Sequence, residues 1–297
     1  MTVPLKGAFL QISNEHADHT VAGWQVAVSD MNRLQMELVI IQAEAYLKHD
    51  DSRDEVTRGY IINALWRAEE LNMKVWIGLI YPKGCVGDQA CVKDEARIDN
   101  IIKKSKESAD LIFEQFGSSS SFGGFYLPLE GWTPEGYDEL KFYKKYLIEV
   151  SKYCRSKGEG LQIATSPFIN KQSAQQAIIT EEVYKSFLKE TDLSIILLQD
   201  GLGGNNVPLD VVPAYMSAMK NACDDAGIEM WANIEAFVND TTAAGFERVQ
   251  KQITAAREVT NNLVTFEFYK YWTRHLHIPG AAELNDAYYQ TYIDTTP

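Results

Sequence analysis

Two short stretches of this sequence end an apolar run on a single glutamate. The stretch "GGFYLPLEGW" contains Glu130, and the stretch "MWANIEAF" contains Glu235. Removing a charged group from water without a partner is unfavourable, so a carboxylate at the end of a buried strand needs an explanation. Two carboxyl groups that face each other across a pocket are the minimal apparatus for cleaving a glycosidic bond. We therefore take Glu130 and Glu235 as candidate catalytic residues.

Short apolar segments alternate with longer amphipathic segments along the chain. Strands are expected at 7–12, 37–42, 74–80, 124–129, 161–165, 194–199, 229–234 and 263–268, and helices near 21–33, 54–72, 94–116, 134–156, 180–190, 209–226, 243–259 and 283–293. Thr133 and Pro134 mark the start of the fourth helix, with an N-cap hydroxyl before a proline at the first helical position.

Eight β-then-α units in 297 residues predict an α/β fold, a single (β/α)₈ TIM barrel that spans residues 1–297 as one domain. An open doubly wound sheet is the alternative. That fold usually has a glycine-rich phosphate loop after its first strand, where this chain has "LQISNEHADH". The first loop therefore favours the barrel.

In such a barrel, the residues that follow the strands converge at one mouth. Polar and aromatic residues that could bind a substrate there are Gln11, Gln42, Glu44, Trp132, Ser166, Phe168, Gln199, Asp200, Asn233, Glu267, Tyr269 and Trp272. Trp231 also lies near the strand ends in this map, and aromatic faces can stack on the apolar faces of sugars. Three of the acids have structural interpretations too: Glu44 can cap a helix, Asp200 can form an Asx turn, and Glu267 can point outward after a one-residue change of register.

Glutamates after strands four and seven resemble the catalytic pair of the clan A retaining glycoside hydrolases. The resemblance implies that Glu130 is the acid/base and that Glu235 is the nucleophile. Leu129 departs from the pattern, because that clan usually has an asparagine there, which recognises the sugar 2-hydroxyl.

The pieces "GAFLQ", "GFYLPLE", "TSPF", "LLQDGLG" and "WANIEAF", spread over most of the chain, more closely resemble an uncharacterised bacterial group, domain-of-unknown-function family 4434. Its members are thought to be glycosidase-like barrels. This resemblance implies one cleft lined by Gln11, Glu44, Glu130, Gln199, Asp200, Asn233 and Glu235.

The favoured function is hydrolysis of a neutral or cationic poly- or oligosaccharide, with retention as the favoured mechanism. The net charge of −13 argues against nucleic acid as a partner, and no apolar run is long enough to span a membrane. We expect a carbohydrate substrate, no cofactor, and a monomer. Two alternatives stay open: a carbohydrate-binding barrel without catalysis, and a metal-dependent lyase or isomerase that uses Glu44, Glu130 and Asp200.

Other chemistry has weak support in the sequence. The pairs His16/His19 and His275/His277 have ligand-like spacing but lie in loop-like stretches, and "GSSSSFGG" lacks the Gly-x-Ser-x-Gly pattern of a serine nucleophile. Cys154 and Cys223 are expected as core thiols. Cys85 and Cys91 bracket a short loop and could close it as a disulfide. No signal peptide is visible, so the location is either secreted or periplasmic, if a leader was trimmed, or cytoplasmic.

Overall fold

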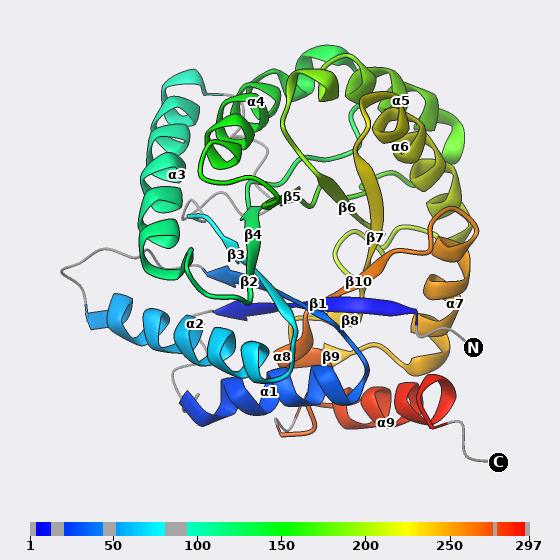
Figure 1. Ribbon diagram of the computed structural model, residues 1–297. Helices are drawn as coiled ribbons and strands as arrows, with labels where there is room; N and C mark the ends of the chain where they lie inside the picture. Colours follow the sequence, from blue (N-terminus) through cyan, green and yellow to red (C-terminus); the bar gives the residue numbers. More distant parts are fainter. Residues whose placement is uncertain (1–3, 13–20, 44–51, 81–93, 276–277, 295–297) are drawn as a thin grey trace.

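Eight parallel strands close into a barrel, as the sequence predicts (Figure 1). The computed structural model describes the chain except for residues 1–3, 13–20, 44–51, 81–93, 276–277 and 295–297. Around the barrel the strands follow their order in the chain, and the last, β10, pairs with both β7 and β1. Their bounds are β1 Leu5–Ile12, β2 Leu38–Ala43, β3 Lys74–Gly78, β4 Phe122–Leu127, β5 Gln162–Thr165, β6 Ile195–Gln199, β7 Glu229–Glu235 and β10 Leu263–Phe266.

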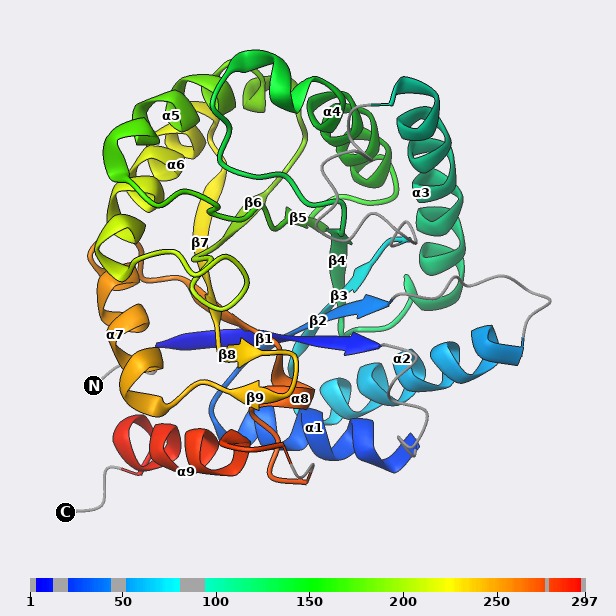
Figure 2. The ribbon, with the colours of Figure 1, turned by 180° about the vertical axis from the view of Figure 1, so that it is seen from behind.

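Helices surround the barrel and cover the outer face of the strands (Figures 1 and 2). Their bounds are α1 Val21–Arg33, α2 Ser52–Glu70, α3 Glu95–Phe116, α4 Lys141–Arg155, α5 Ala177–Lys185, α6 Val212–Ala226, α7 Phe246–Arg257, α8 Phe268–Tyr271 and α9 Ala281–Tyr292. Apart from the short α8, each follows one barrel strand, which confirms the (β/α)₈ arrangement. Among the described helices, none is long and apolar enough to cross a membrane.

Side chains of the strands alternate between the inside of the barrel and the surrounding helices. One cluster fills the inside with Phe9, Leu38, Ile40, Trp76, Tyr126, Ala164, Ile195, Leu197 and Val264. A second and larger cluster joins the outward residues of the strands to the buried faces of the helices. It includes Cys154 and Cys223, which are free buried thiols as expected.

The fourth unit differs from its predicted bounds. Strand β4 ends at Leu127, two residues early, and Pro128 follows, which has no N–H for the sheet. The predicted helix start at Thr133 and Pro134 is wrong, because α4 begins at Lys141 after a 3₁₀ turn over Tyr137–Leu140. The Thr133 hydroxyl is instead bonded to Asn170, 2.7 Å from its side-chain Oδ1 and 3.2 Å from its backbone N. The residues after β4 therefore run beside those after β5 rather than starting a helix.

A small antiparallel hairpin follows β7 and was not predicted. It consists of β8 Phe237–Asn239 and β9 Thr242–Ala243, and it lies beside α8 (Figures 1 and 2). Backbone hydrogen bonds connect it to its surroundings: Ala244 N donates to Ala236 O at 2.8 Å, and Ala243 N donates to Pro279 O at 3.0 Å. The hairpin thus belongs to the carboxyl end of the barrel, where Glu235 ends β7.

Candidate functional site

Because side chains alternate along each strand, several of the predicted site residues point into the barrel at its mouth. Phe9, Ile40, Ala164 and Leu197 line the inside of the barrel, and Trp231 packs against them. Residues an even number of positions further along face the same way. These are Gln11, Gln42, Ser166, Gln199, Asn233 and Glu235. Gln11 and Gln42 are paired in register between β1 and β2.

Glu130 lies three residues beyond the end of β4 and is partly buried. Gln199 Nε2 donates to its Oε1 at 3.1 Å and to the carbonyl of Ser166 at 2.7 Å. Loss of hydration raises the pKa of Glu130 to about 7, and the bond from Gln199 acts in the opposite direction. This carboxyl can therefore hold a proton near neutral pH.

Glu235 is the last residue of β7, and only 2% of it is exposed. Its Oε2 accepts the backbone N–H groups of Gly203 at 2.6 Å and Gly204 at 2.7 Å. Loss of hydration raises its pKa to about 8, and the charges of Asp200 and Glu130 raise it as well, whereas the two N–H groups lower it. Because the Glu130 charge affects the pKa of Glu235, the two candidate catalytic carboxyls interact electrostatically.

The turn that holds Glu235 requires glycine at its start. Gly201 has φ of +73°, and a Cβ there would lie 2.2 Å from the carbonyl oxygen of Ile169. Gly203 is equally restricted by space, since its Cβ would lie 2.7 Å from the carbonyl oxygen of Phe237. The sequence "DGLGG" therefore fixes a backbone course that aims two N–H groups at one carboxylate.

Asn233 and Ser166 form a buried pair on the inner side. Asn233 Nδ2 donates to Ser166 Oγ at 3.2 Å, and that hydroxyl donates to the carbonyl of Leu197 at 2.7 Å. Asn233 Oδ1 has no hydrogen-bond partner among the described residues. It is thus an acceptor that a substrate hydroxyl or a water molecule could satisfy.

Three predicted substrate-binding residues after β10 are used elsewhere. Both oxygens of the Glu267 carboxylate cap α8, with the N–H groups of Tyr269 at 2.9 Å and Lys270 at 2.6 Å as donors. Burial raises the pKa of Glu267 to about 7. Tyr269 stacks on Trp24 of α1 with a ring separation of 5.5 Å. Trp272 is fully buried and donates to Thr265 Oγ1 at 3.1 Å.

Two further predicted residues and one other aromatic are positioned by packing. Trp132 is buried, and its Nε1 donates to Glu139 Oε2 at 3.0 Å. Phe168 is partly buried, and its backbone bridges Trp132 and Gln199, so it joins the segments after β4, β5 and β6. Trp231 lies early in β7 beside Trp76 and under the Lys6 ammonium, so it belongs to the amino end of the barrel rather than to the mouth.

Sequence reasoning missed two aromatic residues of the mouth. Phe266, the last residue of β10, faces inward, lies 5.5 Å from the ring of Phe9 and is partly exposed. Phe237 of β8 lies 6.2 Å from it, ring to ring, and stacks on Tyr271 at 5.2 Å. The alternation of β10 was the available signal: with Val264 inside the barrel, Phe266 must be inside and Glu267 outside.

The family model of the domain of unknown function DUF4434 matches residues 5–282. The chain belongs to this family. No curated protein matches the sequence.

Solved structures similar to this DUF4434 chain include a putative alpha-L-fucosidase from Bacteroides thetaiotaomicron VPI-5482. It has a TM-score of 0.78 and 20% identity over 97% of this chain and 92% of that one. The endo-1,4-beta-mannanase of Rhizomucor miehei has a TM-score of 0.59 and 12% identity, covering 89% and 86%. The intracellular xylanase of Thermoanaerobacterium saccharolyticum has a TM-score of 0.54 and 10% identity, covering 89% and 88%. At these identities the likeness establishes the shared barrel fold.

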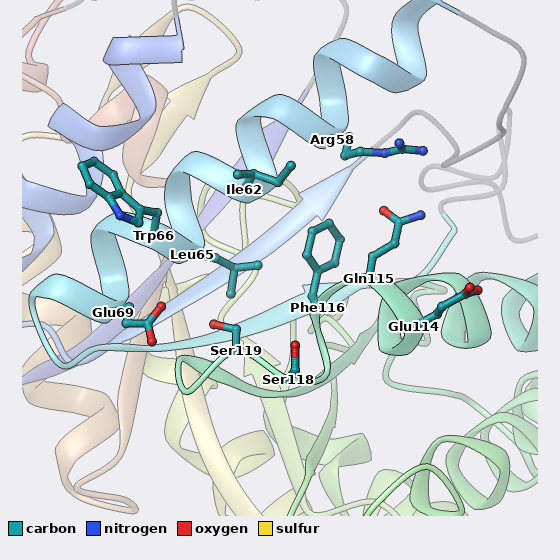
Figure 3. A pocket seen from close by; sticks show the side chains of 10 residues that line it. All are labelled: Arg58, Ile62, Leu65, Trp66, Glu69, Glu114, Gln115, Phe116, Ser118 and Ser119. Carbon is teal, nitrogen blue, oxygen red and sulfur yellow. The ribbon is translucent and has the colours of Figure 1, made fainter.

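Two cavities of the DUF4434 barrel lie away from the candidate site. One, of 530 Å³, opens between α2 and α3, with Ile62, Leu65 and Phe116 in its lining (Figure 3). The other, of 600 Å³, lies at the amino end of the barrel beside Glu229 and Asn262. Neither contains Glu130 or Glu235, so neither replaces the mouth as the candidate site.

Several predictions fall outside the described residues. Glu44, the Cys85–Cys91 pair and the His16/His19 pair lie there, as does His277, the partner of His275. Within the described ranges, no group of three or more histidines, cysteines and acids is arranged to hold a metal ion.

Proposed function

We propose that the protein is a glycoside hydrolase in which Glu130 and Glu235 are the catalytic carboxyls. The observation that carries this proposal is the pair itself: one acid just beyond β4 and one at the end of β7, both with raised pKa values and within electrostatic range of each other. Three solved neighbours, described as a putative fucosidase, a mannanase and a xylanase, support the same reaction class.

The hydrogen bonds support different roles for the two acids in a retaining reaction. Two backbone N–H groups can only donate, so they favour an ionised Glu235, as a nucleophile requires. Glu130 accepts a single neutral amide and keeps partial exposure, which suits a group that gives a proton to the leaving oxygen and later takes one from water. Glu235 would attack the anomeric carbon and form a covalent glycosyl–enzyme, which water then hydrolyses.

The remaining inner residues of the mouth would recognise the sugar. Gln11, Gln42 and Asn233 offer amide groups, and Phe266 offers a partly exposed aromatic face. Leu129 is buried in the core and presents no polar group, so it cannot bind the sugar 2-hydroxyl. We assign that contact to the unsatisfied Oδ1 of Asn233, which is an acceptor for a hydroxyl proton.

The test compares Glu130→Gln and Glu235→Gln with the wild type on a panel of aryl glycosides and oligosaccharides that begins with α-L-fucosides. Either variant should lose at least about 10²–10⁴-fold in kcat/KM, the usual contribution of one acid–base group. Glu247→Gln is the matched control, because Glu247 is exposed on α7 and pairs with the exposed Lys251 of the same helix. Equal activity of all three variants would refute the paired-acid assignment.

Azide separates the two roles. With Glu235→Ala, azide should restore cleavage and give a glycosyl azide of the inverted configuration, because it attacks in place of the missing nucleophile. With Glu130→Ala, the glycosyl–enzyme still forms on substrates with good leaving groups, and azide should give the retained product. The opposite pattern would exchange the roles of the two residues.

A further inference from the structure

Asp200 lies on the helix-facing side of the barrel wall, behind Glu235. It follows Gln199, an inward residue, and its side chain is fully buried. Its Oδ1 accepts the backbone N–H of Leu202 at 3.2 Å and that of Glu235 at 3.4 Å. Its Oδ2 accepts Gln252 Nε2 at 2.6 Å. Both oxygens are occupied within the protein, so Asp200 does not line the mouth as the sequence suggested.

Two side chains of α7 complete the environment of the Glu235 main chain. Gln252 Nε2, besides contacting Asp200, donates to the carbonyl of Glu235 at 3.1 Å. Arg248 Nη2 donates to the same carbonyl at 3.0 Å and to that of Phe237 at 2.5 Å. The N–H and the C=O of Glu235 are therefore both bonded to buried side chains, while its own side chain is bonded to the turn that starts beside Asp200.

We propose that Asp200 is a positioning residue for Glu235: it fixes the Glu235 main chain and places a negative charge beside its carboxyl, with Arg248 as the opposing positive charge. The consequence for reaction rate rests on the proposed function. The consequence for the proton affinity of Glu235 needs no assumption about the reaction. No sequence pattern assigns this role, because Asp200, Arg248 and Gln252 come from two elements that meet only in the folded chain.

The charges around Glu235 can be named element by element among the described residues. Asp200 faces it from the end of β6, Glu130 from beyond β4, and Arg248 from α7. After loss of hydration, the Asp200 charge is the largest cause that raises the pKa of Glu235. Such a carboxylate has a higher affinity for a proton and, by the same Brønsted relation, a higher reactivity toward an anomeric carbon.

The test uses two substitutions that should act in opposite directions. Asp200→Asn removes the negative charge but keeps an acceptor for Leu202 N and Glu235 N. Gln252 can turn its amide so that Oε1 accepts from the new amide group, which gives up its bond to the Glu235 carbonyl, but Arg248 Nη2 still donates to that carbonyl. Arg248→Gln removes the positive charge. Asp200→Asn should lower the pKa of Glu235 by about one unit or more, and Arg248→Gln should raise it.

The pKa of Glu235 is to be followed directly, by ¹³C NMR of its side-chain carboxyl in the wild-type protein and both variants. This measurement needs no substrate, so it stands even if the protein cleaves no glycoside. Asp210→Asn, at an exposed aspartate beyond the same turn, is the control and should leave the titration unchanged. An unshifted titration in Asp200→Asn would overturn the proposal, as would shifts of the same sign in both variants.

If the protein is active, the acidic limb of the pH profile of kcat/KM should shift together with the pKa of Glu235 measured by NMR. It should lie at lower pH in Asp200→Asn, with a reduced maximum, because the less basic carboxylate is the weaker nucleophile. A titration that moves while the acid limb stays fixed would leave the effect on Glu235 intact and would argue that Glu235 is not the nucleophile. If Arg248→Gln does not fold, Asp200→Asn and its control decide the outcome alone.

Discussion

At the scale of single residues, the two carboxyls of the mouth have similar proton affinities but different surroundings. The pKa of Glu235, about 8, lies above that of Glu130, about 7, and this order is the reverse of that for a nucleophile and an acid. The donors favour Glu235 as the nucleophile, since the N–H groups of Gly203 and Gly204 bind its ionised form more strongly than its neutral form and so lower its pKa. A sugar bound between the carboxyls would also displace water from Glu130 and raise its pKa further.

The buried charge of Glu235 should lower stability at alkaline pH. Glu235→Gln should therefore raise the melting temperature at pH 8 by a few degrees while abolishing activity. At pH 5 the wild-type carboxyl is already protonated, since its pKa is about 8, so the difference should vanish. Calorimetry at both pH values checks this, with the exposed Glu247→Gln as control. A difference of equal size at the two pH values would contradict the expectation.

Phe266 should contribute to substrate binding through its ring. It faces inward beside Phe9 and keeps partial exposure at the mouth. Phe266→Ala should raise KM about tenfold, which corresponds to about 1.4 kcal/mol, and change kcat less. Steady-state kinetics on the first active substrate provides the measurement. Val238→Ala, at an exposed position of β8, is the control. An unchanged KM would show that the Phe266 ring does not contribute to substrate binding.

At the scale of elements, the connection after β6 positions the last residue of β7 at the mouth of the barrel. The turn 201–204 presents its N–H groups to Glu235, and the β8–β9 hairpin limits the space beside that turn through the Phe237 carbonyl. Helix α7 holds the other side of the same peptide through Gln252 and Arg248. Two consecutive β/α units, the sixth and the seventh, therefore determine the orientation of one carboxylate.

A methyl group at Gly203 should disturb this arrangement. Gly203→Ala would place Cβ 2.7 Å from the backbone carbonyl of Phe237, so the turn or the hairpin must shift and the N–H bond to Glu235 must lengthen. We expect a loss of activity of tenfold or more with an intact fold by circular dichroism. Gly136→Ala, where a Cβ would meet nothing within 4 Å, is the control and should leave the activity unchanged. Equal kinetics of both variants would show that the turn is not critical.

At the scale of the whole molecule, buried acids make the fold sensitive to pH. Burial raises the folded-state pKa values of Glu130, Asp200, Glu235 and Glu267 to between about 6 and about 8, above those of the unfolded chain. The folded protein therefore binds more protons than the unfolded one above about pH 4, and stability falls as the pH rises through this window. The net charge of −13 adds repulsion in the same direction.

The free energy of unfolding should accordingly be larger at pH 5 than at pH 8. Urea denaturation at pH 5, 6, 7 and 8 measures it. Well below pH 4 the trend should reverse, because acids such as Asp110 have lowered folded-state pKa values through lysine partners, although that pair is partly exposed and its effect is small. A free energy that rises from pH 5 to pH 8 would contradict the assignment of buried, protonated acids.

The sequence by itself determined the barrel and the two central acids. Apolar runs and amphipathic segments repeat with local periods, so eight β/α units could be counted without knowing any long-range contact. Glu130 and Glu235 stood out because each interrupts such a run. The inward direction of Gln11, Gln42, Ser166, Gln199 and Asn233 also follows from alternation once the strands are placed.

Only the tertiary structure decided what each side chain after a strand touches. Asp200 and Glu267 come directly after strands and look like site residues, yet one is bonded to α7 and the other caps α8. The partner of Asp200 lies in α7, whose position no local pattern encodes. Glu267 bonds only two and three residues ahead, but a shift of one residue in the predicted strand reverses the side to which its side chain points. Phe266 was missed because the register of the predicted strand 263–268 was open by one residue, and the position of Val264 inside the barrel shows that Phe266 faces the mouth.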